Sequence, residues 1–217
     1  MIYPVTTPRW LRSLYPGRIW SMPGDAKIIY LSFDDGPDPE VTPFVLDELD
    51  KFNAKATFFC IGRNVEQHPE VYRRLLQEGH AVGNHTYDHC NGWKTADTVY
   101  LESVQRARQW IDSSLFRPPY GRIRSRQVKK LQSDEMQYQT VMWSILSGDF
   151  DTALTPEDCL QNVLKNTGAG DIVVFHDSQK AFTRLCYTLP RMLNHFAGQG
   201  FLFEKLSVKK NKKTEMA

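Results

Sequence analysis

Short apolar runs that favour β-structure alternate along this chain with longer segments in which apolar positions recur at helical spacing. The predicted strands are residues 27–33, 56–61, 80–83, 115–117, 138–144, 171–175 and 201–206. The predicted helices are residues 41–52, 69–78, 96–112, 125–133, 156–166 and 182–196. Strands that alternate with helices predict an α/β fold with a largely parallel sheet. The chain has no internal repeat and no low-complexity linker, so we expect a single domain.

Two architectures fit this order of elements, a barrel and an open doubly wound sheet. The sequence contains neither the dinucleotide fingerprint GxGxxG nor the phosphate loop GxxxxGK[ST]. Dehydrogenases and P-loop enzymes are therefore poor fits. We expect residues 27–206 to form the folded domain, residues 1–26 an N-terminal extension packed on it, and residues 207–217 a basic flexible tail.

The apolar residues of the N-terminal extension have two interpretations. They are Trp10, Leu11, Leu14, Tyr15 and Trp20. We expect a short helix after Pro8 that plugs the bottom of the fold, and docking at a membrane interface is the alternative.

Charge and hydropathy exclude several classes of protein. The chain has 27 Lys and Arg against 25 Asp and Glu, a formal net charge of +2, which argues against a nucleic-acid partner. No segment approaches the roughly 20 apolar residues of a transmembrane helix. Pro4, Pro8, Arg9 and Arg12 interrupt any apolar core of a secretory signal, so we expect a cytoplasmic protein.

The four cysteines show no CxxC pairing and no close spacing. They are Cys60, Cys90, Cys159 and Cys186. In a cytoplasmic chain they are most simply reduced thiols. Cys90 directly follows His89 and is at most a minor candidate for a metal ligand.

Titratable residues stand repeatedly at the ends of the predicted strands. They are Asp34, Asp35, His85, His89, Arg117, Asp149 and His176. In a parallel barrel the carboxyl ends of the strands meet on one face, which is where such folds carry their active sites. Packing alone does not explain this placement, so we expect a catalytic site there.

The pair His85 and His89 points to a metal. Two histidines four residues apart, in one helical turn or a loop of similar reach, can face the same ion. With one aspartate from the turn at residues 34–35 they supply three protein ligands and leave coordination positions open, as in catalytic zinc sites. The same ligand set occurs in non-haem iron oxygenases, whose usual hosts are all-β folds. We therefore favour zinc.

The remaining polar residues leave alternatives open. Adjacent aspartates before Gly-Pro are also ordinary turn chemistry. The segment FRPPYG at 116–121 is either a rigid turn or a device that aims Arg117 at a carboxylate and a backbone N–H at an oxyanion. His176 is a plausible general acid, with Asp149 to orient it.

Taken together, these motifs resemble those of the NodB-homology polysaccharide deacetylases, carbohydrate esterase family 4. SFDDGP at 32–37, HTYDH at 85–89, RPPYG at 117–121 and IVVFH at 172–176 follow the order of the family's motifs. The resemblance spans residues 27–206. It implies a deformed (β/α) barrel, a single domain with about seven parallel strands.

The resemblance also implies residue roles. Asp35, His85 and His89 would bind a divalent metal, most simply Zn²⁺, with Co²⁺ or another divalent ion as alternatives. Asp34 would be the general base, held by Arg117. The backbone N–H of Tyr120 would stabilise the oxyanion. His176, oriented by Asp149, would protonate the leaving amine.

Three positions depart from the family pattern. Leu146 stands where the family usually has aspartate, Phe150 where it has tryptophan, and Val174 where it has leucine. Phe150, Val174 and Tyr120 would bind the substrate, and the first two would form an apolar acetyl pocket that is roomier than usual.

The expected function is removal of N-acetyl groups from an amino-sugar oligo- or polysaccharide. Alternatives are an O-acetyl esterase, a hydrolase of another small amide, or a carbohydrate-binding module without activity. Family members commonly act outside the membrane, so a cytoplasmic chain implies a cytosolic precursor as substrate or another route of release. The sequence does not define the oligomeric state.

Overall fold

A computed structural model describes residues 3–22, 24 and 26–207. Its strands are β1 (Ile28–Asp34), β2 (Thr57–Cys60), β3 (Ala81–Asn84), β4 (Leu115–Phe116), β5 (Gln139–Thr140), β6 (Ile145–Leu146), β7 (Ile172–His176) and β8 (Leu202–Glu204). Its helices are α1 (Arg9–Leu14), α2 (Val41–Asp50), α3 (Gly62–Gln67), α4 (Pro69–Gln77), α5 (Asp97–Arg108), α6 (Ser125–Leu131), α7 (Pro156–Asn166) and α8 (Gln179–Gly198), with the 3-10 turn η1 (Pro119–Gly121).

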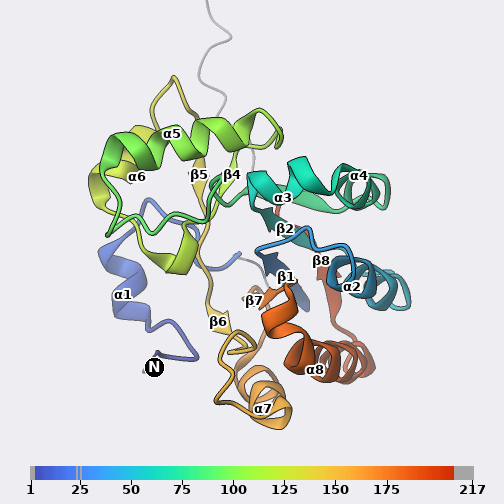
Figure 1. The fold of residues 1–217 in the computed structure, drawn as a ribbon. Helices are drawn as coiled ribbons and strands as arrows, with labels where there is room; N and C mark the ends of the chain where they lie inside the picture. The colour runs from blue at the N-terminus through green and yellow to red at the C-terminus, as the bar shows by residue number, and fades with distance from the viewer. Residues whose placement is uncertain (1–2, 23, 25, 208–217) are drawn as a thin grey trace, which may run out of the picture.

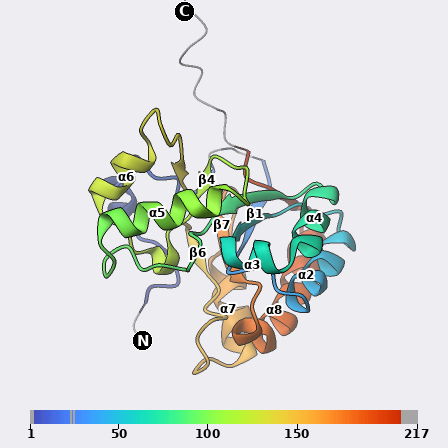
Figure 2. The same cartoon turned by 45° about the horizontal axis from the view of Figure 1, so that its top comes forward.

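All the strand pairs are parallel and belong to one sheet of eight strands, in the order β5-β4-β3-β2-β1-β7-β6, with β8 also paired to β1. The sheet curls, with helices around its outside (Figure 1). In Figure 2, α5 and α6 lie on one side of the strands, and α2, α4, α7 and α8 lie on the other. This incomplete barrel confirms the predicted fold class.

Side chains alternate between the two faces of the central strand β1. Ile29, Leu31 and Phe33 point outward into the core cluster that α2 and α8 complete. Ser32 and Asp34 occupy the alternate positions, which face the barrel interior, and both are buried. Because both faces of β1 are covered, a polar side chain on its inner face needs a partner inside the barrel.

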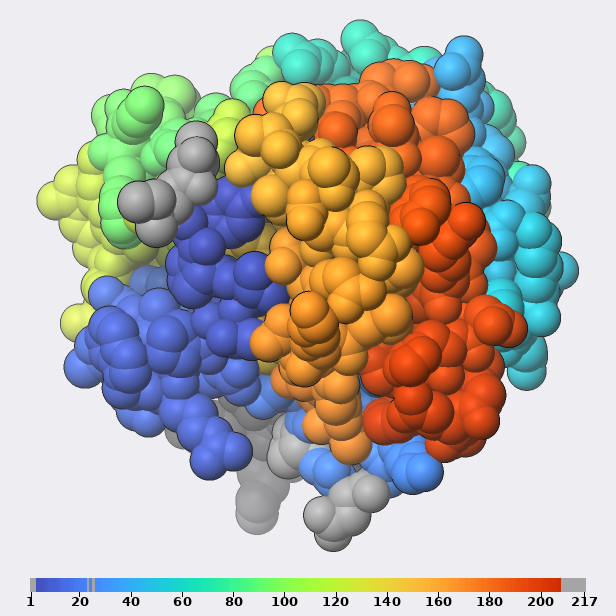
Figure 3. All heavy atoms as spheres, turned by 90° about the horizontal axis from the view of Figure 1, so that it is seen from below, coloured from blue at the N-terminus to red at the C-terminus, as the bar shows by residue number. Residues whose placement is uncertain are grey.

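The predicted strand at 138–144 is wrong in one respect. Within this range only β5 forms, and β6 begins just after it at Ile145; the two strands stand at opposite ends of the sheet and do not pair with each other. Segments of the N-terminal extension lie between β5 and β6 instead and pair with the chain there. Thr7 N donates to Ser144 O (2.9 Å), and Ile19 N donates to Thr140 O (2.9 Å). Figure 3 shows this blue segment on the surface between the green and the orange parts of the chain.

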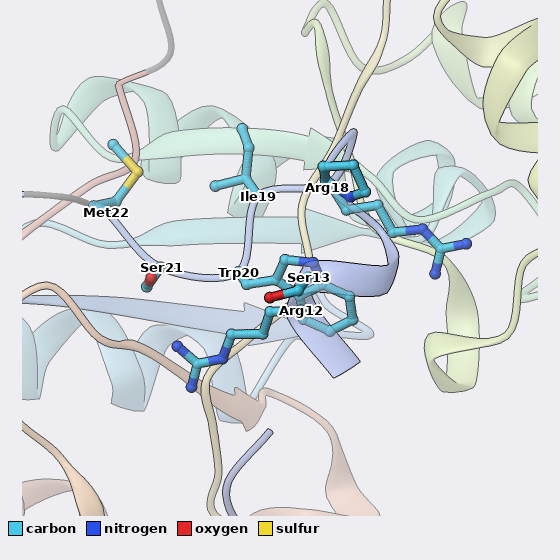
Figure 4. A pocket seen from close by; sticks show the side chains of 8 residues that line it. Arg12, Ser13, Arg18, Ile19, Trp20, Ser21 and Met22 are labelled. Carbon is cyan, nitrogen blue, oxygen red and sulfur yellow. The ribbon is translucent and has the colours of Figure 1, made fainter. Parts of the chain in front are cut away.

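The helix α1 does not plug the barrel, contrary to expectation. None of its residues is buried, and Trp10 is 67% exposed. Between α1 and the segment that follows it lies a surface hollow of about 540 Å³, lined by Arg12, Trp20 and Met22 among others (Figure 4). No predicted site residue lines this hollow, so it is separate from the candidate site.

The predicted helices all form, with bounds that shift by a few residues, and α3 is an additional helix that the sequence analysis missed. All four cysteines are free thiols. None of the described helices is both long and apolar enough to cross a bilayer. The proposed tail lies outside the described residues from position 208 onward, and the division of the chain at 26 and 206 stays a prediction.

Candidate active site

The predicted site residues meet at the carboxyl end of the sheet. Asp34 is the last residue of β1 and His176 the last of β7, and these two residues are register partners on neighbouring strands. His85 directly follows β3, and Arg117 directly follows β4. Parallel strands bring their carboxyl ends to one face of the fold, which places these side chains together.

Asp34 is paired with Arg117. Nη1 of Arg117 donates to Oδ1 of Asp34 at 2.7 Å and to the hydroxyl of Ser32 at 2.8 Å, while Nη2 donates to Met142 O at 2.9 Å. The guanidinium also lies over the ring of Phe59, with 4.1 Å between Cζ and the ring centre. Arg117 is fully buried, and its position is therefore fixed from several sides.

The charge of Arg117 survives this burial. Burial lowers the pKa of the guanidinium, and the charge and hydrogen bond of Asp34 oppose that effect. Since arginine stays protonated in proteins, the pair is an ion pair inside the barrel. No described residue donates to Oδ2 of Asp34, which leaves this oxygen available to a water molecule.

Asp35, His85 and His89 form a compact cluster in which one ligand atom from each lies within 4.8 Å of the others. Oδ1 of Asp35 stands 3.6 Å from Nε2 of His85 and 3.1 Å from Nε2 of His89. Ligand atoms about 2.1 Å from a tetrahedral zinc ion are about 3.4 Å apart. The spacing of the cluster therefore suits a divalent ion of this size.

The hydrogen bonds around the cluster also suit a metal. Nδ1 of His85 contacts Arg117 O at 2.8 Å, and Nδ1 of His89 contacts the hydroxyl of Tyr120 at 3.1 Å, so both Nε2 atoms face Asp35. Oδ1 of Asp35 is buried and makes no hydrogen bond of good geometry to any described residue. A buried carboxylate oxygen without a partner between two imidazole nitrogens is a position that a cation satisfies.

The protonation states of His85 and Asp35 also suit a bound metal. Burial lowers the pKa of His85 to about 4, although the nearby charge of Asp34 opposes it, so the imidazole is neutral at pH 7. Burial alone would raise the pKa of Asp35, but the close contact of Nε2 of His89 with Oδ1 and the charges of the surrounding histidines outweigh it and hold that pKa well below its usual range. A neutral imidazole and an ionised carboxylate are the forms that bind metals.

The backbone around this cluster adopts a conformation that non-glycine residues rarely take. Of the six described non-glycine residues with positive φ, four border the site: Asp35 (84°), Thr86 (63°), His89 (56°) and Tyr120 (60°). Each such residue costs of order 1–3 kcal/mol, and strain of this kind gathers at functional sites. The turns at 85–89 therefore place both imidazoles without a helix.

His176 and Asp149 form the third unit of the site. Nδ1 of His176 contacts Oδ1 of Asp149 at 2.7 Å, and the backbone N–H of His176 donates to Oδ2 at 2.8 Å. Asp149 is fully buried. Burial lowers the pKa of His176, but the charge and hydrogen bond of Asp149 outweigh it and raise this pKa to about 9. The imidazole is thus positively charged at neutral pH.

A titration of metal-free protein should show this raised pKa directly. We expect the ring signals of His176 to titrate near pH 9 in an NMR experiment, and those of His80, whose pKa burial lowers to about 4, to titrate far below. In Asp149→Asn, burial remains while the carboxylate charge is gone, so the pKa of His176 should fall below 6.5.

The protonation of His176 should also make the stability of the fold depend on pH. Because its folded-state pKa is raised above 6.5, the stabilisation by protonated His176 is fully present below pH 6.5 and is lost as the pH rises through about 9. This pH-dependent loss should be smaller in Asp149→Asn. An unchanged titration of His176 in that variant would contradict the pairing.

Two of the three predicted substrate residues lie beside this pair, and the third lies beside His89. The rings of Phe150 and His176 meet edge to face at 5.2 Å, and Val174 lies two residues before His176, on the same face of β7. Tyr120 is 61% exposed, and its ring is centred 4.5 Å from that of His89. Leu146 is buried in β6 and pairs with Val174. Their roles in substrate binding stay predictions.

Three contributors to the site were missed in the sequence. Tyr3 packs on Phe150 with ring centres 5.1 Å apart, and its hydroxyl donates to Asp151 at 3.0 Å. Ser32 binds Arg117, as described above. Asp177 is buried, with a pKa that burial raises well above its usual range. All three act through contacts between residues distant in the sequence, which a motif does not reveal.

Asp177 supports the turn that carries both aspartates. Its Oδ1 accepts the N–H of Gly36 at 3.0 Å, and its Oδ2 accepts the hydroxyl of Thr42 at 2.6 Å. A Cβ at position 36 would stand 2.0 Å from Oδ2 of Asp177. The glycine is therefore required by this close approach.

We expect Gly36→Ala to lower the free energy of unfolding by about 1–3 kcal/mol, because the new methyl group displaces Asp177. Gly198→Ala is the matched control, since a Cβ there meets nothing within 4 Å. Urea unfolding measures both. Equal midpoints for the two variants would show that Asp177 does not brace the turn.

The sequence of this chain is similar to those of known deacetylases. Residues 21–139 match the family described as Polysaccharide deacetylase. The chain is 37% identical over 194 residues to a peptidoglycan-N-acetylglucosamine deacetylase of Bacillus cereus, covering 87% of this chain and 90% of that protein. It is 35% identical over 156 residues to a chitooligosaccharide deacetylase of Azorhizobium caulinodans, covering 69% and 73%.

A solved structure gives the same result. The crystal structure of the Bc1960 peptidoglycan N-acetylglucosamine deacetylase, in complex with 4-naphthalen-1-yl-N-oxidanyl-benzamide, superposes with a TM-score of 0.83 at 30% identity. It covers 92% of this chain and 95% of that one. The protein therefore belongs to the NodB-homology polysaccharide deacetylases, the enzymes of carbohydrate esterase family 4, as its motifs predict.

Proposed function

We propose that this protein is a metal-dependent N-deacetylase that acts on N-acetylglucosamine units of a peptidoglycan glycan. The observation that carries the proposal is the meeting of three units at one end of the sheet: the Asp34–Arg117 pair, the cluster around Asp35, and the His176–Asp149 pair. Amide hydrolysis needs a base for the attacking water and an acid for the leaving nitrogen. This arrangement supplies both.

Asp34 is the base. Arg117 occupies its Oδ1 through a hydrogen bond, while Oδ2 takes the proton of the attacking water. The hydrogen bond from the buried guanidinium also fixes the orientation of the carboxylate. Asp34 and Asp35 are adjacent in the chain, and the turn at Gly36 allows them to serve different partners.

Asp35, His85 and His89 hold the cation. A divalent ion such as zinc bound there would polarise the acetyl carbonyl and make a water molecule more acidic. The chain's own contribution is to orient both histidines, through Arg117 O and the Tyr120 hydroxyl.

His176 is the acid. Its raised pKa keeps it protonated at neutral pH, and Asp149 holds the ring through Nδ1, so Nε2 is the atom that delivers the proton. An amine leaves readily only when protonated, which makes this step essential. The backbone N–H of Tyr120 would stabilise the oxyanion, and Phe150 with Val174 would contact the acetyl methyl group.

Two relatives support an N-acetylglucosamine glycan as the substrate, one named as a peptidoglycan-N-acetylglucosamine deacetylase and the other as a chitooligosaccharide deacetylase. The test is to incubate purified peptidoglycan with zinc-loaded protein, digest the glycan with a muramidase and analyse the fragments by mass spectrometry. We expect free amines at N-acetylglucosamine units.

Two results would contradict the proposal. Loss of O-linked acetyl groups alone would make the protein an esterase, and tight glycan binding without any change in mass would make it a binding module. The cytoplasmic location expected from the N-terminal residues stays a prediction, as does the oligomeric state.

A further inference from the structure

An exposed tryptophan stands on the loop that leads away from the cluster. Trp93 follows His89 by four residues and is 53% exposed. The guanidinium of Arg122 lies over its ring, with 4.2 Å between Cζ and the ring centre. Arg122 in turn follows Tyr120 by two residues, a distance of at most about 7 Å between Cα atoms. Both side chains therefore belong to loops that border the candidate site.

These two loops are joined and held in place. Gly92 N donates to Arg122 O at 3.1 Å, and a Cβ at position 92 would stand 2.4 Å from that oxygen. Gln127 Nε2 donates to Gly92 O at 3.0 Å. Arg124 donates to the carbonyls of Trp93 and Thr95. The backbone of Trp93 is thus fixed although its side chain is open to solvent.

Burial does not explain this fixed tryptophan, because its ring contributes little to any core cluster. An aromatic side chain that is already ordered loses little conformational entropy when it binds a ligand. Rigid support of an exposed aromatic residue is how binding sites are built.

Arg122 carries a charge without a partner. No carboxylate of the described residues lies within ion-pair distance of its guanidinium, whereas the neighbouring Arg124 and Arg126 are both paired with Asp97. The guanidinium makes no hydrogen bond to any described residue, and its Cζ lies over the Trp93 ring. The N–H groups at its edge stay available for a planar anion, and a carboxylate matches this fork with two parallel hydrogen bonds.

We propose that Trp93 and Arg122 form a subsite for a carboxylate-bearing sugar next to the unit that is deacetylated. The indole would contact the C–H groups of the sugar ring, and Arg122 would bind the carboxylate. This inference rests on the proposed function, since it places the acetyl group at Asp34 and His176. Its consequence is a preference for acidic over neutral glycans.

In peptidoglycan such a carboxylate has two sources, the lactyl group of muramic acid and the stem peptide. Three ligands of equal sugar length distinguish them: a neutral N-acetylglucosamine oligomer, a glycan with free lactyl carboxylates, and a glycan that carries stem peptides. Binding to each is measured by calorimetry on Asp34→Asn protein, in which we expect turnover of the ligand to be at least about a hundredfold slower.

Variants are made in that Asp34→Asn background. We expect Arg122→Gln to raise the Kd for carboxylate-bearing glycans about tenfold and the Kd for the neutral oligomer less than about twofold. Trp93→Ala should raise both about tenfold. Arg122→Lys should be intermediate, because the charge remains but the planar fork is lost. Trp10→Ala is the control, an exposed tryptophan on α1 for which no change is expected.

The outcomes separate this inference from the proposed function. An Arg122→Gln effect on the acidic glycans but not on the neutral oligomer supports the subsite, and the acidic glycan with the larger effect identifies the source of the carboxylate. Equal effects on neutral and acidic glycans, or none, would overturn it. Because binding is measured separately from turnover, a failure of wild-type protein to release acetate would reject the proposed function and leave this result to stand separately.

Discussion

Replacing Asp34 by asparagine is expected to lower kcat by about 10²- to 10⁴-fold while metal stays bound. The variant keeps the shape of the side chain, and its amide oxygen still accepts the hydrogen bond from Arg117, but it has no group that takes a proton from water. Acetate release at saturating substrate measures kcat, and elemental analysis of the purified protein measures the metal.

His85→Ala is the matched control for this prediction, because it removes a ligand of the cluster rather than the base. We expect it to lose metal and activity together. Near-normal turnover by Asp34→Asn would show that another group is the base. Loss of metal in both variants would show that Asp34 belongs to the metal ligands.

Arg117→Met is expected to lower the free energy of unfolding by about 3–5 kcal/mol, because it leaves the charge of Asp34 buried without its partner. The hydroxyl of Ser32 and the carbonyl of Met142 also lose a donor. Urea unfolding followed by circular dichroism measures the effect. Activity should fall as well, since the base loses its orientation.

The double variant Asp34→Leu with Arg117→Met tests the cause of that loss. Both charged groups are then absent, so we expect it to be more stable than Arg117→Met alone, although inactive. If the double variant is as unstable as the single one, the loss comes from packing around Phe59 and Met142 and not from an unpaired charge.

Local sequence pattern was sufficient for most of the fold. Apolar runs with β-propensity and helical periodicity each marked a real element, because both faces of the central strands are buried and the helices cover them. The pattern failed at 138–144, where the apolar run is divided and the N-terminal extension supplies hydrogen bonds. It also failed at α3, whose sequence GRNVEQ has only one apolar residue besides glycine to indicate a face.

The site could be predicted where titratable residues stand at the carboxyl ends of the predicted strands. Asp34, Arg117 and His176 were expected to converge for that reason, and they do. The spacing of His85 and His89 predicted a shared ion without defining the loop that achieves it. Tyr3 and Asp177 were not predictable, because each acts on a partner more than a hundred residues away.

The central claim is that the cluster at Asp35, His85 and His89 enables removal of N-acetyl groups. Acetate release from N-acetylglucosamine oligomers tests it most directly, with the same preparation stripped by a chelator and then reloaded with zinc. We expect release that stops on stripping and returns with zinc. Release that continues unchanged in stripped protein, or none from folded protein with zinc bound, would contradict it.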